Sequence, residues 1–333
     1  MRIRAAILGG GSWGTTVASL VAKNVPATIW ARSAETVDEI NTKHTNERYL
    51  PGARLTPALR ATTSIEEAVR NADVVVMGVP SQAMRDTVKE VGKHIRAWVP
   101  VISLSKGLEL GTKLRMTQVI EQELPGHPAG VLSGPNLARE VMSGFAAASV
   151  IAMEDEVIVQ ELQAIFKTGL FRVYTNTDVA GCELGGALKN VMAIATGMGD
   201  GAGAGENTRS AVISRALNEV TRLGVKMGGK PETFAGLAGI GDLIATCTSP
   251  QSRNRTVGFE LGKGRKIADI LSGMRQVAEG VKSAKTVLQL GEEYECEMPI
   301  ATEVNGVVND GRTAQDAFRG LLKRVAGAEA DPG

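Results

Sequence analysis

The chain has 333 residues, of which 43% are apolar and 22% are charged, so it is long enough for two domains with sizeable cores. Its formal net charge of +1 gives no reason to expect a nucleic acid or an anionic membrane as partner. No apolar run approaches the ~20 residues of a membrane helix, and the first strand starts too early to leave room for a signal peptide. Three widely spaced cysteines and three isolated histidines favour a reduced, cytoplasmic protein without a metal site.

The first 23 residues read as a strand, a glycine turn and a helix. The apolar run at residues 5–8 precedes Gly9-Gly10-Gly11-Ser12-Trp13-Gly14, whose glycines have the G-x-G-x-x-G spacing. In this motif Gly9 allows a tight turn, Gly11 lets a pyrophosphate approach the backbone, and Gly14 lets the helix pack on the strand. The alternative is an ordinary strand-to-helix turn, but the position directly after a strand favours dinucleotide binding.

The second predicted strand, at residues 27–30, ends close to Arg32. An NAD-binding unit would carry an acidic residue near this point to hold the ribose 2′-hydroxyl. Arg32 is instead suited to a 2′-phosphate, so we expect NADP(H) as the preferred cofactor, with NAD(H) possible. A plain surface arginine is the alternative.

Strands and helices continue to alternate through the first half. We expect strands at 73–79, 99–104, 130–132, 146–153 and 171–174, and helices at 64–69, 81–95, 112–122 and 154–167. Residues 36–63 are polar and contain two prolines, which predicts an irregular connection. Residues 1–178 therefore predict an α/β, Rossmann-like dinucleotide-binding domain with a doubly wound, mainly parallel sheet covered on both faces.

The pattern changes near Asp178. We expect helices at 179–198, 207–223, 231–237, 242–247, 253–261, 266–271, 281–294, 298–308 and 314–325, followed by a frayed tail. Residues 179–333 therefore predict an all-α C-terminal domain, which would bind the substrate.

Two loops follow predicted strand ends, which is where open parallel sheets bind ligands. Lys106 lies in the first loop, and Gly134-Pro135-Asn136 forms the second. Each polar side chain has an ordinary alternative, because Asn136 could simply cap the next helix and Lys106 could be a solvated loop lysine.

Lys189 lies among small and apolar residues of a predicted helix, within residues 184–193. None of its neighbours three and four positions away is acidic, so no ion pair within the helix explains the charge. Desolvation on such a face would suit the amine to proton transfer, and the small neighbours would suit a backbone that a ligand approaches. The alternative is a lysine that snorkels to the helix surface.

Asp242 is the only charged residue in the segment 234–245. Its carboxylate either caps the following helix or pairs with a buried cation. Residues 252–255, Ser-Arg-Asn-Arg, then bring together hydroxyl, guanidinium and amide donors, which suit a phosphate monoester. An exposed basic turn is the alternative.

Six segments, in matching order and spacing, resemble bacterial NAD(P)-dependent sn-glycerol-3-phosphate dehydrogenase. They are Gly9-Gly10-Gly11-Ser12-Trp13-Gly14-Thr15, Ser105-Lys106-Gly107, Leu132-Ser133-Gly134-Pro135-Asn136-Leu137-Ala138, Leu188-Lys189-Asn190, Gly239-Ile240-Gly241-Asp242-Leu243 and Ser252-Arg253-Asn254-Arg255. Each segment alone is weak evidence for this family, but the six segments together are specific to it. The resemblance implies reversible hydride transfer between a nicotinamide and C2 of dihydroxyacetone phosphate or sn-glycerol 3-phosphate. It also implies a role in phospholipid synthesis and a homodimer.

The resemblance also assigns roles to individual residues. Lys189 would donate and accept the proton. The substrate would contact Lys106, Gly134, Asn136, Lys189, Asp242, Ser252, Arg253 and Asn254. NADP(H) would contact Ser12, Trp13, Arg32, Tyr49, Lys106, Ala138, Arg253, Val277 and Glu279, besides Gly9, Gly11 and Gly14 of the glycine motif.

Two other functions remain open. Another NADP-dependent dehydrogenase, acting on a 3-hydroxy acid or on ketopantoate, would share the fold and use a helix lysine. The phosphate-binding donors at residues 252–254 argue against it. A non-catalytic NADP-binding sensor is the second alternative, and the apolar surroundings of Lys189 argue against it.

Overall fold

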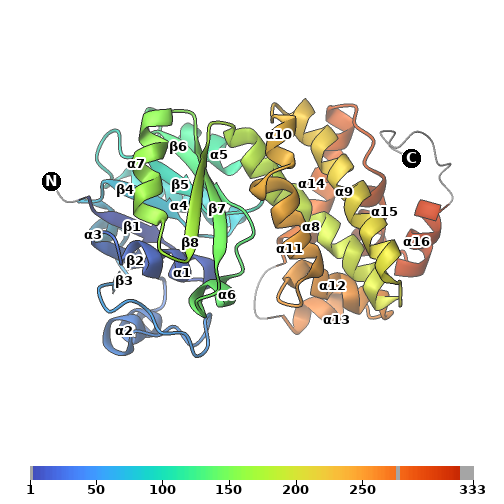
Figure 1. Ribbon diagram of the computed structural model, residues 1–333, viewed down its shortest axis with the longest axis horizontal. Helices are drawn as coiled ribbons and strands as arrows, with labels where there is room; N and C mark the ends of the chain where they lie inside the picture. Colours follow the sequence, from blue (N-terminus) through green and yellow to red (C-terminus); the bar gives the residue numbers. More distant parts are fainter. Residues whose placement is uncertain (1–2, 275–277, 323–333) are drawn as a thin grey trace. The chain divides into compact units, whose positions relative to one another are not determined.

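The computed structural model describes residues 3–274 and 278–322, and it divides into two units (Figure 1). Unit 1 comprises residues 3–109 and 114–179, and unit 2 comprises residues 110–113 and 180–322. Residues 110–113, which come from the α/β half of the sequence, therefore belong to the helical unit. Among the described residues, no helix combines the length and the apolar character that a membrane crossing requires.

Unit 1 is built on one eight-stranded sheet. Its strands are β1 (Ala5–Leu8), β2 (Ala27–Trp30), β3 (Arg60–Thr62), β4 (Val74–Met77), β5 (Val101–Ser103), β6 (Ala129–Ser133), β7 (Ala147–Met153) and β8 (Phe171–Asn176). Their order is β3-β2-β1-β4-β5-β6-β7-β8, and every neighbouring pair is parallel except β6 and β7. The predicted Rossmann-like, mainly parallel sheet is confirmed.

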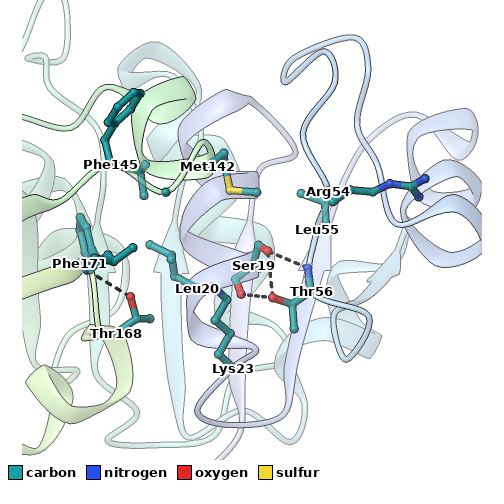
Figure 2. A pocket seen from close by; sticks show the side chains of 13 residues that line it. Ser19, Leu20, Lys23, Arg54, Leu55, Thr56, Met142, Phe145, Thr168 and Phe171 are labelled. Carbon is teal, nitrogen blue, oxygen red and sulfur yellow. Dashed lines mark hydrogen bonds between the residues drawn. The ribbon is translucent and has the colours of Figure 1, made fainter.

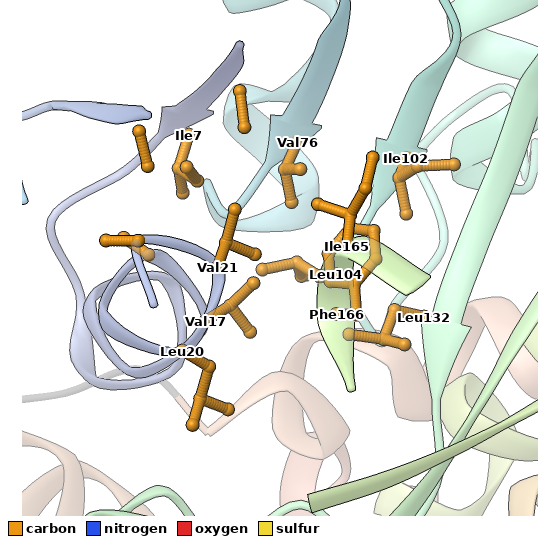
Figure 3. Packing of buried hydrophobic residues seen from close by; sticks show 14 of the residues in the cluster. Ile7, Val17, Leu20, Val21, Val76, Ile102, Leu104, Leu132, Ile165 and Phe166 are labelled. Carbon is orange, nitrogen blue, oxygen red and sulfur yellow. The ribbon is translucent and has the colours of Figure 1, made fainter. Parts of the chain in front are cut away.

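Helices cover both faces of this sheet. They are α1 (Ser12–Val21), α2 (Ala34–Lys43), α3 (Ile65–Val69), α4 (Met84–Gly92), α5 (Met116–Glu123), α6 (Ala138–Met142) and α7 (Glu156–Phe166). Alternate strand residues pack on opposite faces, so Ile7 and Val76 belong to the core under α1 and α7 (Figure 3). Leu8 and Met77 belong to the core under α3, α4 and α5. Burial on both faces explains why β1 and β4 are continuously apolar.

The strand order also positions the glycine motif. β1 lies between β2 and β4, so the chain winds outward from β1 in both directions. Open α/β sheets bind ligands at the carboxyl ends of the strands where such a reversal occurs. β1 ends at Leu8 and β4 ends at Met77, so Gly9 and Gly78 follow at this point.

Two predictions for unit 1 are wrong. Residues 36–63 are not irregular throughout, because α2 begins at Ala34 and β3 is a short strand at the sheet edge. α2 buries little apolar surface and therefore lacks a strong helical period, although Ser33 caps it by accepting a hydrogen bond from the Thr36 N–H. The helix expected at 112–122 begins only at Met116, since Lys113 has a φ of 61°, which a helix cannot contain.

All secondary-structure elements among the described residues of unit 2 are helices, as predicted. Its helices are α8 (Val179–Gly201), α9 (Glu206–Lys226), α10 (Pro231–Phe234), a π-helix (Leu237–Gly241), α11 (Asp242–Thr248), α12 (Arg253–Gly262), α13 (Ile267–Ser272), α14 (Glu279–Glu293), α15 (Pro299–Asn309) and α16 (Ala314–Leu322). α8 is buried on all sides from residue 181 to residue 199, which makes it the central helix of this unit. The helix expected at 231–237 ends at Phe234, and a short turn then leads to the π-helix, which begins at Leu237.

Candidate functional site

The glycine motif of unit 1 forms the turn between β1 and α1. Gly9 has a φ of +128°, and a Cβ at this position would lie 2.5 Å from the carbonyl oxygen of Gly78. A Cβ at Gly14 would lie 2.1 Å from the carbonyl oxygen of Gly9. A Cβ at Gly11, by contrast, would meet nothing within 4 Å. Two glycines are therefore required by close packing, whereas Gly11 leaves space at the N-terminus of α1.

This space suits the pyrophosphate of a dinucleotide. Gly11 is the N-cap of α1, and no side chain caps the helix. The first turn of a helix presents N–H groups and a partial positive charge, which favour a phosphate. The residues present therefore fit a dinucleotide at the point that the motif predicts.

A second segment braces the glycine turn. The buried side-chain amide of Asn46 donates hydrogen bonds to the Gly10 carbonyl oxygen (3.0 Å) and to Thr15 Oγ1 (2.9 Å). Ser12 Oγ donates to the carbonyl oxygen of Tyr49 at 2.8 Å. Tyr49 thus lies beside the turn, as a cofactor-binding residue would require. Sequence reasoning missed Asn46, because it lies about thirty residues beyond the motif in a segment that was expected to be irregular.

Arg32 is exposed just after the end of β2. Its neighbour Ala31 is fixed by a backbone hydrogen bond to the Thr62 carbonyl, and Ser33 begins α2 as its N-cap. The backbone around Arg32 is therefore held on both sides while its guanidinium remains accessible to a ligand.

Trp13 and Ala138 both pack at the edge of the core beneath α1. The Trp13 ring lies 6.1 Å from the ring of Phe171 at an interplanar angle of 59°. Ala138 is the first residue of α6. In these positions both residues can provide apolar contacts beside the glycine turn.

Lys106, Gly134 and Asn136 gather beyond the ends of β5 and β6. Lys106 Nζ donates to the Gly134 carbonyl oxygen at 2.7 Å, and Gly134 has a φ of +132°. Asn136 Nδ2 donates to Ser149 Oγ at 3.2 Å. The capping alternative for Asn136 is wrong, because Leu137 is the N-cap of α6 and no side chain caps that helix. The solvated alternative for Lys106 is also wrong, because its amine is bound and its side chain half-buried.

Unit 1 also forms a pocket of about 220 Å³ between the end of α1, residues 54–56, the end of α6 and the turn before β8 (Figure 2). Its lining contains none of the predicted site residues. Ser19 and Thr56 are hydrogen-bonded to each other, and the Arg54 guanidinium points away from the pocket (Figure 2). We therefore do not assign this pocket to the functional site.

In unit 2, Lys189 is buried near the middle of α8, with a relative exposure of 4%. Its Nζ donates to Thr246 Oγ1 at 2.5 Å and lies 3.3 Å from Asp242 Oδ1. Asn190 Oδ1 is 3.5 Å from the same amine. The snorkelling alternative is wrong, because the amine lies inside a polar network and the side chain is buried.

α11 supplies the partners of Lys189 from a single face. Asp242 and Thr246 are four residues apart, so they lie one turn apart on the same side of this helix. A Cβ at Gly185 would lie 2.4 Å from the Ala238 carbonyl oxygen, so α8 packs directly on the π-helix that precedes α11. The expectation that a ligand approaches the backbone at the small residues around Lys189 is therefore wrong for Gly185. The small residue brings α11 close enough for Asp242 to reach the lysine.

The N-terminus of α12 carries the predicted phosphate-binding residues. Ser252 is the N-cap, and its hydroxyl accepts a hydrogen bond from the Arg255 N–H. Asn254 is buried, with Nδ2 donating to Asn190 Oδ1 (2.9 Å) and Oδ1 accepting from the Gly280 N–H (3.0 Å). Asn190 therefore lies between the lysine and the start of α12. Sequence reasoning missed both Asn190 and Thr246, although Asn190 directly follows Lys189.

Arg253 and Arg255 differ in their surroundings. Arg253 is exposed, although protein packed around part of its side chain lowers the pKa of its guanidinium, and the Glu279 carboxylate acts in the opposite direction. Arg255 is instead held by Asp200. Arg255 is therefore separate from the other donors of the predicted anion site. The alternative of an exposed basic turn is wrong, because Ser252 and Asn254 are buried. Glu279 is the first residue of α14, and Val277 lies outside the described residues.

A buried cysteine lies beside this network. The described residues contain no group of three or more His, Cys, Asp or Glu side chains that could hold a metal ion. Cys247 lies on α11 beside Thr246, and burial raises the pKa of its thiol to about 11. The thiol is therefore neutral at physiological pH and is not an activated nucleophile.

The chain has the architecture of the class of dinucleotide-binding proteins with a Rossmann-like domain and an all-α domain. The strand order and the glycine turn of unit 1 define the first domain, and the helices of unit 2 define the second. Within this class, the chain belongs to the NAD-dependent glycerol-3-phosphate dehydrogenase family. The family model for the N-terminus of these enzymes matches residues 4–159, and the model for their C-terminus matches residues 178–319.

Individual relatives agree with this assignment. The chain is 62% identical to glycerol-3-phosphate dehydrogenase [NAD(P)+] 2 of Sphingopyxis alaskensis, with 100% of both chains covered. It is 56% identical to glycerol-3-phosphate dehydrogenase [NAD(P)+] of Mycobacterium avium, over 97% of this chain and 95% of the relative. The crystal structure of glycerol-3-phosphate dehydrogenase from Coxiella burnetii matches with a TM-score of 0.92 and 36% identity, over 97% of this chain and 99% of that one.

Proposed function

We propose that this protein is an NAD(P)H-dependent sn-glycerol-3-phosphate dehydrogenase that interconverts dihydroxyacetone phosphate and sn-glycerol 3-phosphate. The observation that carries the proposal is the buried Lys189, whose amine lies within 3.5 Å of oxygen atoms of Thr246, Asp242 and Asn190. The N-terminus of α12 lies in the same unit and is linked to it through Asn190 and Asn254. One unit therefore provides a proton donor and an anion site that are joined by direct hydrogen bonds.

Lys189 is the general acid in the reducing direction. Its ammonium form donates a proton to the oxygen on C2 as negative charge develops there, and its neutral form removes that proton in the reverse direction. Asp242 and Thr246 hold the amine in one orientation, which a flexible lysine side chain would not keep by itself. Removal of either Asp242 or Thr246 should leave the amine present but less precisely oriented.

The substrate phosphate binds at the N-terminus of α12. Arg253 supplies a planar, charged donor, Ser252 a hydroxyl group and Asn254 an amide, beside the positive end of the helix dipole. Binding energy from the phosphate then orients the carbonyl for reaction. Lys106, Gly134 and Asn136 of unit 1 are the further substrate residues of this proposal, and Lys106 adds positive charge near the developing oxyanion.

The cofactor supplies or accepts the hydride when it is bound. Gly9, Gly11 and Gly14 form the turn that receives its pyrophosphate, and Arg32 binds the 2′-phosphate, which makes NADP(H) the preferred form. Further contacts in this proposal come from Ser12, Trp13, Tyr49, Lys106, Ala138, Arg253, Val277 and Glu279.

The remaining parts of the proposal concern the cell. The enzyme is cytoplasmic, forms a homodimer and supplies the glycerol phosphate backbone of phospholipids. Support comes from the family and from the organisation of the chain in two units without a membrane-spanning helix among its described residues.

An absorbance assay at about 340 nm, the band of reduced nicotinamide, tests the proposal against its alternatives. NADPH should be consumed with dihydroxyacetone phosphate and not with ketopantoate or a 3-oxo acid. Consumption with ketopantoate alone would assign the other reductase activity. NADPH binding without consumption of any of these substrates would favour the sensor.

A further inference from the structure

The N-terminus of α12 is fixed to α8 by a partly buried ion pair outside the lysine network. Arg255, the third residue of α12, donates to Asp200 Oδ2 from both Nε (3.0 Å) and Nη2 (2.6 Å). The Asp200 side chain is 4% exposed, and its other oxygen accepts a hydrogen bond from Arg209 Nε at 2.8 Å. Both carboxylate oxygens therefore have guanidinium partners, which a buried carboxylate requires.

Adjacent residues of α12 hold α8 at two distant points. Asn254 binds Asn190, beside the lysine, whereas Arg255 binds Asp200 near the other end of the helix. Ten residues of α-helix separate Asn190 from Asp200, which is about 15 Å along the axis. Contacts at both points fix the first turn of α12 against rotation and against sliding along α8.

Between these points the two helices touch backbone to backbone. A Cβ at Gly197 of α8 would lie 2.1 Å from the Arg255 carbonyl oxygen, and a Cβ at Gly258 of α12 would lie 2.1 Å from the Ile194 carbonyl oxygen. Gly201 and Gly262 continue the same contact one turn further on each helix. The helices therefore cannot shift independently, and the ion pair acts on a tightly packed element.

We propose that Asp200 and Arg255 are positioning residues of the phosphate site: their ion pair holds the first turn of α12, and with it Arg253 and Asn254, in register with Lys189 on α8. This inference rests on the proposed function. It divides the two arginines of the sequence Ser-Arg-Asn-Arg between two tasks. Arg253 remains exposed for the phosphate, and Arg255 is engaged by a carboxylate of the same unit.

The pair has a matched control in Arg209. This arginine of α9 binds the same carboxylate, but α9 carries no residue that we assign to substrate or cofactor. Arg255→Gln and Arg209→Gln each remove one guanidinium from Asp200. A general loss of stability should follow from both variants, whereas a displaced phosphate site should follow only from Arg255→Gln.

The experiment compares steady-state kinetics of the full-length wild type, Arg255→Gln, Arg209→Gln and Arg255→Lys with dihydroxyacetone phosphate and with unphosphorylated dihydroxyacetone. Arg255→Gln should raise KM for the phosphorylated substrate on the order of 10- to 100-fold. It should leave kcat/KM for dihydroxyacetone, measured at saturating NADPH, within about twofold of wild type. Arg209→Gln should lower the melting temperature without a change of KM. Arg255→Lys should raise KM less than Arg255→Gln does, because lysine keeps the charge although it loses the two-point contact.

Two results would overturn the inference. One is an equal change of KM in Arg255→Gln and Arg209→Gln. The other is an equal loss with phosphorylated and unphosphorylated substrate in Arg255→Gln. If Arg255→Gln does not fold, KM for dihydroxyacetone phosphate is compared between Arg255→Lys and Arg209→Gln instead, and an equal change in these two variants would overturn the inference. A wild type that does not reduce dihydroxyacetone phosphate would instead refute the proposed function itself, so the two failures are distinguishable.

Discussion

The glycine turn of unit 1 and the lysine network of unit 2 are built from different parts of the chain. The turn consists almost entirely of backbone, and its shape depends on the side chains that are missing at Gly9 and Gly14. The network consists of side chains from three helices, α8, α11 and α12, which meet only in the folded unit. The turn therefore depends mainly on its own backbone, with Asn46 as a distant brace, whereas the side-chain site depends on the packing that brings its helices together.

The largest effect should come from the centre of the network. Lys189→Ala removes the proton donor, so kcat should fall by roughly 10²–10⁴-fold, the usual contribution of a positioned general acid. The Kd for NADPH, measured by fluorescence titration, should be nearly unchanged, because Lys189 is not one of the residues that we assign to the cofactor. Lys285→Ala, which removes an exposed lysine of α14, is the matched control and should keep full turnover.

This contrast also explains what could be predicted from the sequence. The glycine turn is local, since the strand, the glycines and the start of the helix fall within residues 5–15, and these parts are predicted from the sequence. Its brace Asn46 is not, because it lies outside this local segment. Lys189 and Asp242 stood out as single charges in apolar segments, but the role of Thr246 depends on a partner 57 positions away. The pairing of Asp200 with Arg255 gives no local signal, because an exposed acid and an exposed base would have the same sequence pattern.

Arg32 provides the next largest expected effect. Arg32→Asp replaces a guanidinium by a carboxylate at the end of β2, where the 2′-phosphate of NADPH would bind. NADPH binding should weaken by at least ~1.5–3 kcal/mol, the range for a hydrogen bond to a charged group, while NADH binding should change little. Arg70→Asp, at the exposed C-cap of α3, serves as the control for a general change of charge. Equal weakening of both cofactors in Arg32→Asp would remove Arg32 from the 2′-phosphate site.

The glycine turn itself can separate packing from binding. Gly14→Ala would force a Cβ to within 2.1 Å of the Gly9 carbonyl oxygen, so the free energy of unfolding should fall by roughly 1–3 kcal/mol. Gly11→Ala adds a methyl group where no atom lies within 4 Å, so stability should be preserved while NADPH binding weakens. Chemical denaturation and NADPH titration of both variants check this difference. Loss of stability in Gly11→Ala would show that its space is needed for folding.

The smallest predicted effect concerns substrate affinity. Arg253→Lys keeps the charge at the start of α12 but loses the planar fork of the guanidinium. KM for dihydroxyacetone phosphate should therefore rise about fivefold, which corresponds to a loss of roughly 1 kcal/mol of binding free energy. Unphosphorylated dihydroxyacetone, a very poor substrate, should be nearly indifferent to the change. Arg265→Lys, at an exposed ion pair with Glu260, is the control. Equal losses with both substrates would assign Arg253 to the cofactor or to the fold.

The central claim is that Lys189 carries the proton as one unit with Asp242, and single-turnover hydride transfer at saturating NADPH tests it most directly. The measurement compares wild type, Lys189→Ala, Asp242→Asn and the double variant. Both single substitutions should slow the step, and the double variant should be little slower than Lys189→Ala, because residues that act together have non-additive effects. Near-normal hydride transfer in Lys189→Ala would contradict the account.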